Sequence, residues 1–464
     1  MKYKYLSYIF ILALISACQP EIDEFTPDQG TADFSRFIAV GNSLTAGYTD
    51  GALYEQGQKY SFPNLMATQF GPVGGGEFKQ PLLSYPDGIG LQTTPMGTFY
   101  IPRLTLQKIP TCTGEAYRPA PTDPSYINKQ QEMAAALMTP VSSQGPFNNI
   151  GVPGLKSFHM LIPGYDTLNP YYFRFASGPV PGDDTLIAEI RRIDPTFFSV
   201  WIGNNDLLDY ALAGGEEGGP AHKITTVGPD PVFGHPGYAE SMNTVLTSLA
   251  DPLAHNAKGI LINVPDILMS PYFNTIPYNG LILRRGQADT LNMAYAQVPN
   301  INFDAGPNPF VIEDPGVQTG MRFIEEGEHI LAIVLDSVEC KGYGSAKPIP
   351  GKYVLTHQEV SNIHGAINEY NSELQDIITK FPANVAYLDF HALLKQAHET
   401  GIYADGIEFT TEGITGNLFG LDGLHLSPQG NALVAYYCIE AINANFDAQV
   451  PQVTITSFPS IVYP

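Results

Sequence analysis

Two short segments near opposite ends of the chain carry residues that could form a serine nucleophile and its base. Phe37-Ile-Ala-Val-Gly-Asn-Ser43 is an apolar run that leads into a Gly-Asn-Ser turn, which predicts a buried strand with a hydroxyl at its carboxyl end. Leu421-Asp-Gly-Leu-His425 places a carboxylate and an imidazole three residues apart. Because a serine hydroxyl is a weak nucleophile, it requires a nearby base and a partner that orients that base. Ser43, His425 and Asp422 could supply this chemistry.

Two segments between them could donate hydrogen bonds to a reaction intermediate. Asn149-Ile-Gly-Val-Pro-Gly154 is a glycine-rich turn, and Thr196–Asp206 is an apolar run that ends in Gly-Asn-Asn-Asp. A tetrahedral acyl intermediate develops negative charge on one oxygen, and preorganised donors stabilise that charge. A glycine N–H and an asparagine carboxamide suit this task because both donate without carrying a charge.

In this order, the four segments resemble blocks I, II, III and V of the SGNH, or GDSL, family of serine hydrolases. Together they span residues 37 to 437 of the 464-residue chain. The resemblance implies that Ser43 is the nucleophile, that His425 is the general base and that Asp422 is the acid that orients His425. It also implies three oxyanion donors, which are the N–H of Ser43, Gly154 and Asn205.

In the second block, Gly151 and Gly154 are both candidates for the backbone donor, and the spacing from Asn149 favours Gly154. Family members usually carry Asp where this chain has Asn42, a position outside the triad. The serine segment also differs from the Gly-x-Ser-x-Gly elbow of the α/β-hydrolases, because the next glycine comes four residues after Ser43. The acid and the base also lie together here, at the C-terminal end.

In the rest of the sequence, segments that predict strands alternate with segments that predict helices. Lys258–Val264 and Asn384–Phe390 are short apolar runs that predict buried parallel strands. Thr356-His-Gln-Glu359 is a capping box before an apolar stripe that reaches Ile378, and Gly430–Cys438 predicts a closing helix. We therefore expect an α/β fold, and the resemblance implies a three-layer α/β/α sandwich with a parallel flavodoxin-like sheet and long loop insertions.

We expect the hydrolase domain to cover residues 36–447, followed by a C-terminal tail at 448–464. Insertions are expected around 72–147, 210–236 and 265–355, and the first two are rich in glycine and proline and predict irregular structure. Ligands of open α/β sheets bind beyond the carboxyl ends of the strands. The insertions could therefore wall the active site, or they could decorate the surface of an exported protein.

The N-terminus has the features of a lipoprotein signal. Lys2 and Lys4 precede a short apolar run, and Leu14-Ile-Ser-Ala-Cys18 resembles a bacterial lipobox. We expect residues 1–17 to be a signal peptide, Cys18 to be the lipidated residue and 18–35 to be an acidic tether. This predicts anchoring to the outer membrane of a Gram-negative bacterium, on its periplasmic or its surface-exposed face.

The composition excludes some partners. The chain has 46 acidic and 23 basic residues, a formal net charge of −23, so it should repel nucleic acid. Besides Cys18, the cysteines are Cys112, Cys340 and Cys438, which allow at most one disulfide and suggest no metal cluster.

The expected activity is hydrolysis of carboxylic esters through an acyl-enzyme intermediate, which requires no metal or organic cofactor. The expected substrates are lipid-like or small acyl esters at the cell envelope. Two alternatives are an O-acetyl esterase that acts on glycans and a surface binding protein that keeps the fold without turnover.

Overall fold

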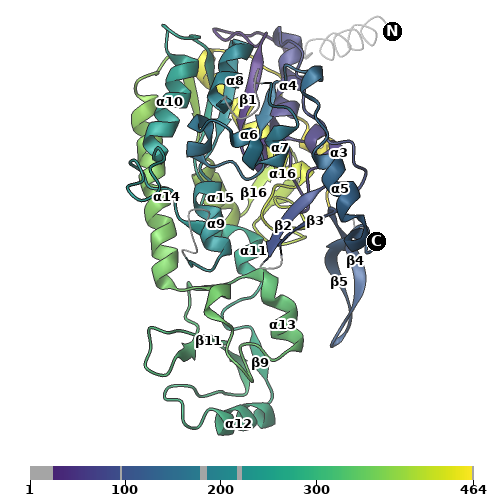
Figure 1. The fold of residues 1–464 in the computed structure, drawn as a ribbon, viewed down its shortest axis with the longest axis vertical. Helices are drawn as coiled ribbons and strands as arrows, with labels where there is room; N and C mark the ends of the chain where they lie inside the picture. Colours follow the sequence, from purple (N-terminus) through teal and green to yellow (C-terminus); the bar gives the residue numbers. More distant parts are fainter. Residues whose placement is uncertain (1–24, 95–96, 178–184, 217–221, 462–464) are drawn as a thin grey trace, which may run out of the picture.

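A parallel β-sheet of five strands forms the centre of the fold (Figure 1). The structure is a computed structural model and describes residues 25–94, 97–177, 185–216 and 222–461. The strands are β1 (Phe37–Gly41), β6 (Asn149–Gly151), β7 (Phe197–Trp201), β8 (Lys258–Ile262) and β15 (Val385–Leu388). They lie in the order β15-β8-β7-β1-β6, and every neighbouring pair is parallel. The predicted α/β class with a parallel sheet is confirmed, and this strand order is the one found in flavodoxin.

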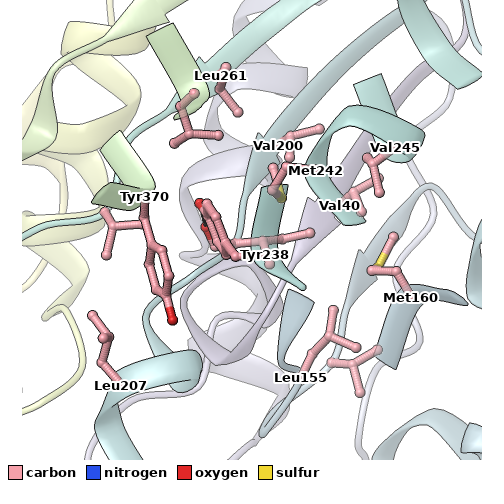
Figure 2. Packing of buried hydrophobic residues seen from close by; sticks show 14 of the residues in the cluster. Val40, Leu155, Met160, Val200, Leu207, Tyr238, Met242, Val245, Leu261 and Tyr370 are labelled. Atoms are coloured by element: carbon pink, nitrogen blue, oxygen red, sulfur yellow. Dashed lines mark hydrogen bonds between the residues drawn. The ribbon is translucent and has the colours of Figure 1, made fainter. Parts of the chain in front are cut away.

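Helices cover both faces of this sheet. Side chains alternate between the faces, so that in β1 Ile38 and Val40 join one apolar cluster while Phe37 and Ala39 join the other. The first face is covered by α8 (Leu186–Ile193), α10 (Tyr238–Ala250) and α14 (His357–Ile378). The opposite face is covered by α4 (Phe62–Phe70), α15 (Phe390–Glu399) and α16 (Pro428–Phe446). Figure 2 shows part of the first cluster, where the rings of Tyr238 and Tyr370 stack at 3.9 Å and join α10 to α14.

The two helices predicted in the C-terminal half are present. At the start of α14, the Glu359 carboxylate accepts the N–H of Thr356 at 2.9 Å, as the capping box predicts. α16 is longer than the predicted Gly430–Cys438, because Ser427 Oγ caps the helix earlier by accepting the N–H of Gly430 at 2.9 Å. Shorter elements are α2 (Ser43–Ala46), α3 (Glu55–Lys59), α6 (Tyr165–Leu168), α7 (Pro170–Phe173), α9 (Asn205–Leu212), β16 (Ile402–Ala404) and β17 (Ile407–Phe409).

The segment 72–147 is more regular than predicted. It contains two antiparallel hairpins, β2 (Gly90–Thr94) with β3 (Gly97–Ile101) and β4 (Leu104–Thr111) with β5 (Gly114–Pro121), and the helix α5 (Gln130–Leu137). The prediction of irregular structure was wrong here because each ribbon has only two strands. Proline is tolerated at an unpaired edge, where its missing N–H breaks no ladder. In the described part of 210–236, the helix α9 ends at Leu212, and no strand or further α-helix follows it.

The segment 265–355 forms a lobe beyond the ends of the strands, at the lower end of Figure 1. Two further apolar clusters, one around Ile312 and one around Phe303, form its interior. Its elements are α11 (Pro271–Asn274), β9 (Leu281–Leu283), α12 (Arg285–Ala294), β10 (Gly306–Asn308), β11 (Val311–Glu313), β12 (Met321–Phe323), β13 (His329–Ile330), α13 (Leu335–Cys340) and β14 (Val354–Leu355).

A disulfide joins this lobe to the β4–β5 hairpin. Cys112, in the turn of the hairpin, is bonded to Cys340 at the end of α13. An ion pair between Arg118 and Glu339 lies at the same junction. Cys438 is a free thiol buried in α16. Two segments far apart in the sequence are therefore held together covalently.

Both ends of the described chain pack against the domain. Asp28 pairs with Gln449, and the buried ring of Phe34 stacks on Phe70 at 4.2 Å. The segment expected as a tether up to residue 35 is thus packed from Asp28 onward, because Phe34 is a core side chain. The expected signal peptide and Cys18 lie outside the described residues. Within the described part of the chain, no helix has the length and apolarity to cross a membrane.

Candidate active site

Ser43 is placed at the carboxyl end of a central strand by a tight turn. β1 ends at Gly41, and Ser43 is the first residue of α2. A Cβ on Gly41 would lie 2.6 Å from the carbonyl oxygen of Trp201 in the adjacent strand, so only glycine fits there. Asn42 caps the short helix, since its side-chain oxygen accepts the N–H of Leu44 at 3.0 Å. The predicted strand and turn are both present.

The loop before α16 brings the predicted base and acid to Ser43. His425 Nε2 lies 2.9 Å from Ser43 Oγ across 382 residues of sequence. His425 Nδ1 lies 2.9 Å from Asp422 Oδ2 on the other side of the ring. The predicted nucleophile, base and orienting acid therefore form one hydrogen-bonded chain, which is the arrangement that an activated serine requires.

The Asp422 carboxylate is held by backbone donors as well as by the imidazole. It accepts the N–H groups of Gly51 at 2.7 Å, Leu424 at 2.9 Å and His425 at 2.8 Å. Burial raises the pKa of this carboxyl, but the charge of His425 and the hydrogen bonds outweigh burial, so the pKa lies below its ordinary value. Asp422 is thus ionised at neutral pH and fixed in orientation.

Residues just after Ser43 support the acid–base loop, and no sequence pattern had marked them for this role. Asp50 accepts the N–H of Leu421 at 2.8 Å, and Thr49 donates its hydroxyl to the carbonyl of Leu426 at 2.8 Å. Asp50 has a positive φ of 51°. The Asp50-Gly51 dipeptide is a turn signal and could have marked this segment as structured, although not its partner.

Tyr48 packs against the catalytic candidate His425, and it was also missed. The two ring centroids lie 4.6 Å apart. The Tyr48 hydroxyl donates to the carbonyl of Gly51 at 2.5 Å, and burial raises the pKa of the phenol, so it stays neutral. The phenol ring therefore limits the movement of the imidazole from one side.

The candidate oxyanion donors lie on two loops that are bonded to each other. Asn205, the first residue of α9, donates from Nδ2 to the carbonyl of Leu155 at 3.1 Å, which leaves one hydrogen of its amide for a ligand. The buried carboxylate of Asp206 accepts both the N–H and the hydroxyl of Ser157, the latter at 2.6 Å. The loop that follows β6 is therefore fixed to the end of β7.

The two candidate glycines, Gly151 at the end of β6 and Gly154 in the loop after it, differ in whether their N–H is free to bind a ligand. The N–H of Gly151 is engaged, because it donates to Asn149 Oδ1 at 2.9 Å. Among the described residues, the N–H groups of Gly154 and Ser43 have no acceptor. Gly154 is exposed with φ at +82°, and it does not border the pocket that contains Ser43. Its part in an oxyanion site therefore stays a prediction.

A small pocket contains Ser43, Asn205 and His425. Its volume is about 50 Å³, and most of its lining is apolar, including Leu208, Ile267, Phe390, Leu394, Phe419 and Leu424. β1 and β7 are neighbours at the point where the strand order reverses, which is where open α/β sheets bind ligands. Two larger cavities, of about 580 and 570 Å³, border Leu421 but not Ser43.

Comparisons of the chain with protein-family models, with curated proteins and with solved structures find no match. Within the described ranges, no group of three or more His, Cys, Asp or Glu side chains is arranged to hold a metal ion. The functional conclusion therefore depends on the geometry around Ser43.

Proposed function

We propose that this chain is a carboxylic-ester hydrolase that works through Ser43, His425 and Asp422. The observation that carries the proposal is the hydrogen-bonded chain from Ser43 Oγ through His425 to Asp422, with both distances at 2.9 Å. The pocket beside Ser43 offers space for the ester, and the carboxamide of Asn205 borders the same pocket.

In the first half of the reaction, His425 Nε2 takes the Ser43 proton as Oγ attacks the ester carbonyl. The N–H of Ser43 and the amide of Asn205, with the N–H of Gly154, stabilise the oxyanion of the tetrahedral intermediate. The imidazolium then gives its proton to the leaving alcohol. Water attacks the resulting acyl-enzyme with His425 again as base, which releases the acid and restores Ser43. Asp422 holds the tautomer and stabilises the imidazolium throughout.

We also propose that the chain is an SGNH-type hydrolase in which 72–147, 210–236 and 265–355 are insertions. The parallel sheet and its strand order support this assignment. Among the strands of the central sheet in chain order, the serine follows the first and the asparagine follows the third, which supports the assignment as well. The N–H of Gly154 is the free backbone donor of the second block, which favours Gly154 over Gly151.

Hydrolysis of 4-nitrophenyl acetate by the purified protein tests the proposed activity. We expect saturable release of nitrophenol by the wild type and only background release by the same amount of Ser43→Ala. Equal release by both proteins at the background rate would favour a binding protein without turnover.

Replacement of Asn205 by alanine should lower kcat by about 10²- to 10³-fold with little change in KM, since its amide is proposed to bind the oxyanion more strongly than the ground-state carbonyl. Steady-state kinetics measure both constants, and thermal unfolding checks that loss of the Leu155 contact leaves the fold intact. A raised KM with normal kcat would instead make Asn205 a substrate-binding residue.

We propose that the protein is anchored by a lipid on Cys18 in the envelope of a Gram-negative bacterium. The Cys112–Cys340 disulfide supports an oxidising compartment. We expect Cys18→Ala to move the protein from the membrane to the soluble fraction at unchanged specific activity, because the packed chain begins only at Asp28. Metabolic labelling with a fatty-acid analogue followed by fractionation tests this. Wild-type protein that is soluble and unlabelled would contradict it.

A further inference from the structure

The pocket at Ser43 is too narrow for a long chain. Its volume is about 50 Å³, against roughly 150 Å³ for a cavity that holds one benzene molecule. This space fits a small acyl group and leaves little room for a lipid chain.

The nucleophile and one apolar wall of the pocket lie toward different strands. Ser43 follows β1, and Asn204 and Asn205 follow the neighbouring β7; this end of the pocket, which Leu44 and Leu208 also line, is called the polar end. Phe390 and Leu394 belong to α15, which follows β15 at the edge of the sheet. Phe390 and Leu394 are both buried and form the wall toward β15.

Unpaired polar atoms in the lining indicate a ligand at the polar end. Asn42 Nδ2, Asn204 Oδ1 and Ser270 Oγ are buried and have no hydrogen-bond partner within the described residues. All three residues line the pocket. Because buried polar groups are nearly always hydrogen-bonded, these atoms point to polar ligand atoms, such as those of an ester group. The apolar wall then faces the acyl chain.

We infer that this pocket binds the acyl group of the substrate and selects chains of two to about four carbons, an inference that rests on the proposed ester hydrolysis. Leu394 and Phe390 are the residues that limit chain length. Forcing further methylenes into a packed wall displaces side chains, and a misfit of one methylene typically changes kcat/KM by about 10- to 200-fold. The substrate is thus a small acyl ester and not a lipid-like one.

The test is kcat/KM for 4-nitrophenyl esters from acetate to dodecanoate, measured on the full chain and on three variants. We expect wild-type kcat/KM to fall at least tenfold from butanoate to octanoate. Leu394→Ala should raise the octanoate-to-butanoate ratio at least tenfold. Phe390→Leu, at the other residue that limits chain length, should raise it in the same direction if Leu394→Ala does not fold. Leu433→Ala, equally buried but outside the pocket, is the matched control and should leave the ratio unchanged.

Two outcomes overturn the inference while the proposed function stands. One is a wild-type rate that rises toward dodecanoate. The other is a rate that depends on the length of the alcohol in a series of alkyl acetates and not on the length of the acyl chain, which would place the alcohol in the pocket. No hydrolysis of any ester, together with no labelling of Ser43 by a fluorophosphonate, overturns the proposed function and the inference together.

Discussion

Replacement of Ser43 by alanine should abolish ester hydrolysis, with a fall in kcat on the order of a million-fold. Ser43 Oγ is the only protein atom in the proposed mechanism that forms a bond to the acyl group, and it is 2.9 Å from His425 Nε2. The side chain is buried at 7 % exposure but makes no other hydrogen bond within the described chain, so its loss should cost little stability.

The measurement is single-turnover and steady-state hydrolysis of 4-nitrophenyl acetate by wild type and variant from parallel preparations. Ser35→Ala is a suitable control, since Ser35 is an exposed serine at the other end of the same strand. Retention of more than a few per cent of the wild-type rate by Ser43→Ala would exclude Ser43 as the nucleophile.

Replacement of Asp422 by asparagine should lower kcat by about 10⁴-fold, as the same change does in other triads. The carboxylate accepts four N–H groups, three from the backbone and one from the His425 ring. An amide nitrogen cannot accept any of them, so an asparagine would either repel a backbone donor or favour the wrong imidazole tautomer. The variant should therefore retain the fold, with kcat reduced far more than KM is changed.

His425→Ala provides the comparison for this variant, because it removes the base itself and should be more severe than Asp422→Asn. Rates of Asp422→Asn close to those of wild type would point to a Ser-His pair without an acid. In that case the carboxylate would serve only to order the loop between Leu421 and Leu426, and thermal unfolding would detect that role.

The strands and the triad could be predicted because their signals are local. The apolar run that ends at Gly41 indicates a strand and a turn on its own, and the capping box at Thr356 marks the start of α14. Asp422 and His425 are close in the sequence, so one loop carries both. Their meeting with Ser43 is a long-range contact, which the sequence indicated only through the base and acid that a serine nucleophile needs and through the resemblance to a family.

The supporting contacts could not be predicted because they join distant segments through backbone atoms. Gly51 donates to Asp422 across 371 residues, and no sequence pattern at either position indicates that the two are in contact. The packing of Tyr48 on His425 likewise joins two distant segments with no sequence pattern that links them. The hairpin β4–β5 was missed because its prolines indicate loops in most contexts, whereas a two-stranded ribbon leaves edges where proline costs nothing.

The central claim is that Ser43 is an activated nucleophile, and mass spectrometry of the protein after reaction with a fluorophosphonate tests it most directly. We expect one adduct per chain, located on Ser43, which is absent from Ser43→Ala and formed much more slowly by His425→Ala. Folded wild-type protein that forms no adduct, or an adduct on any other residue, would contradict the account.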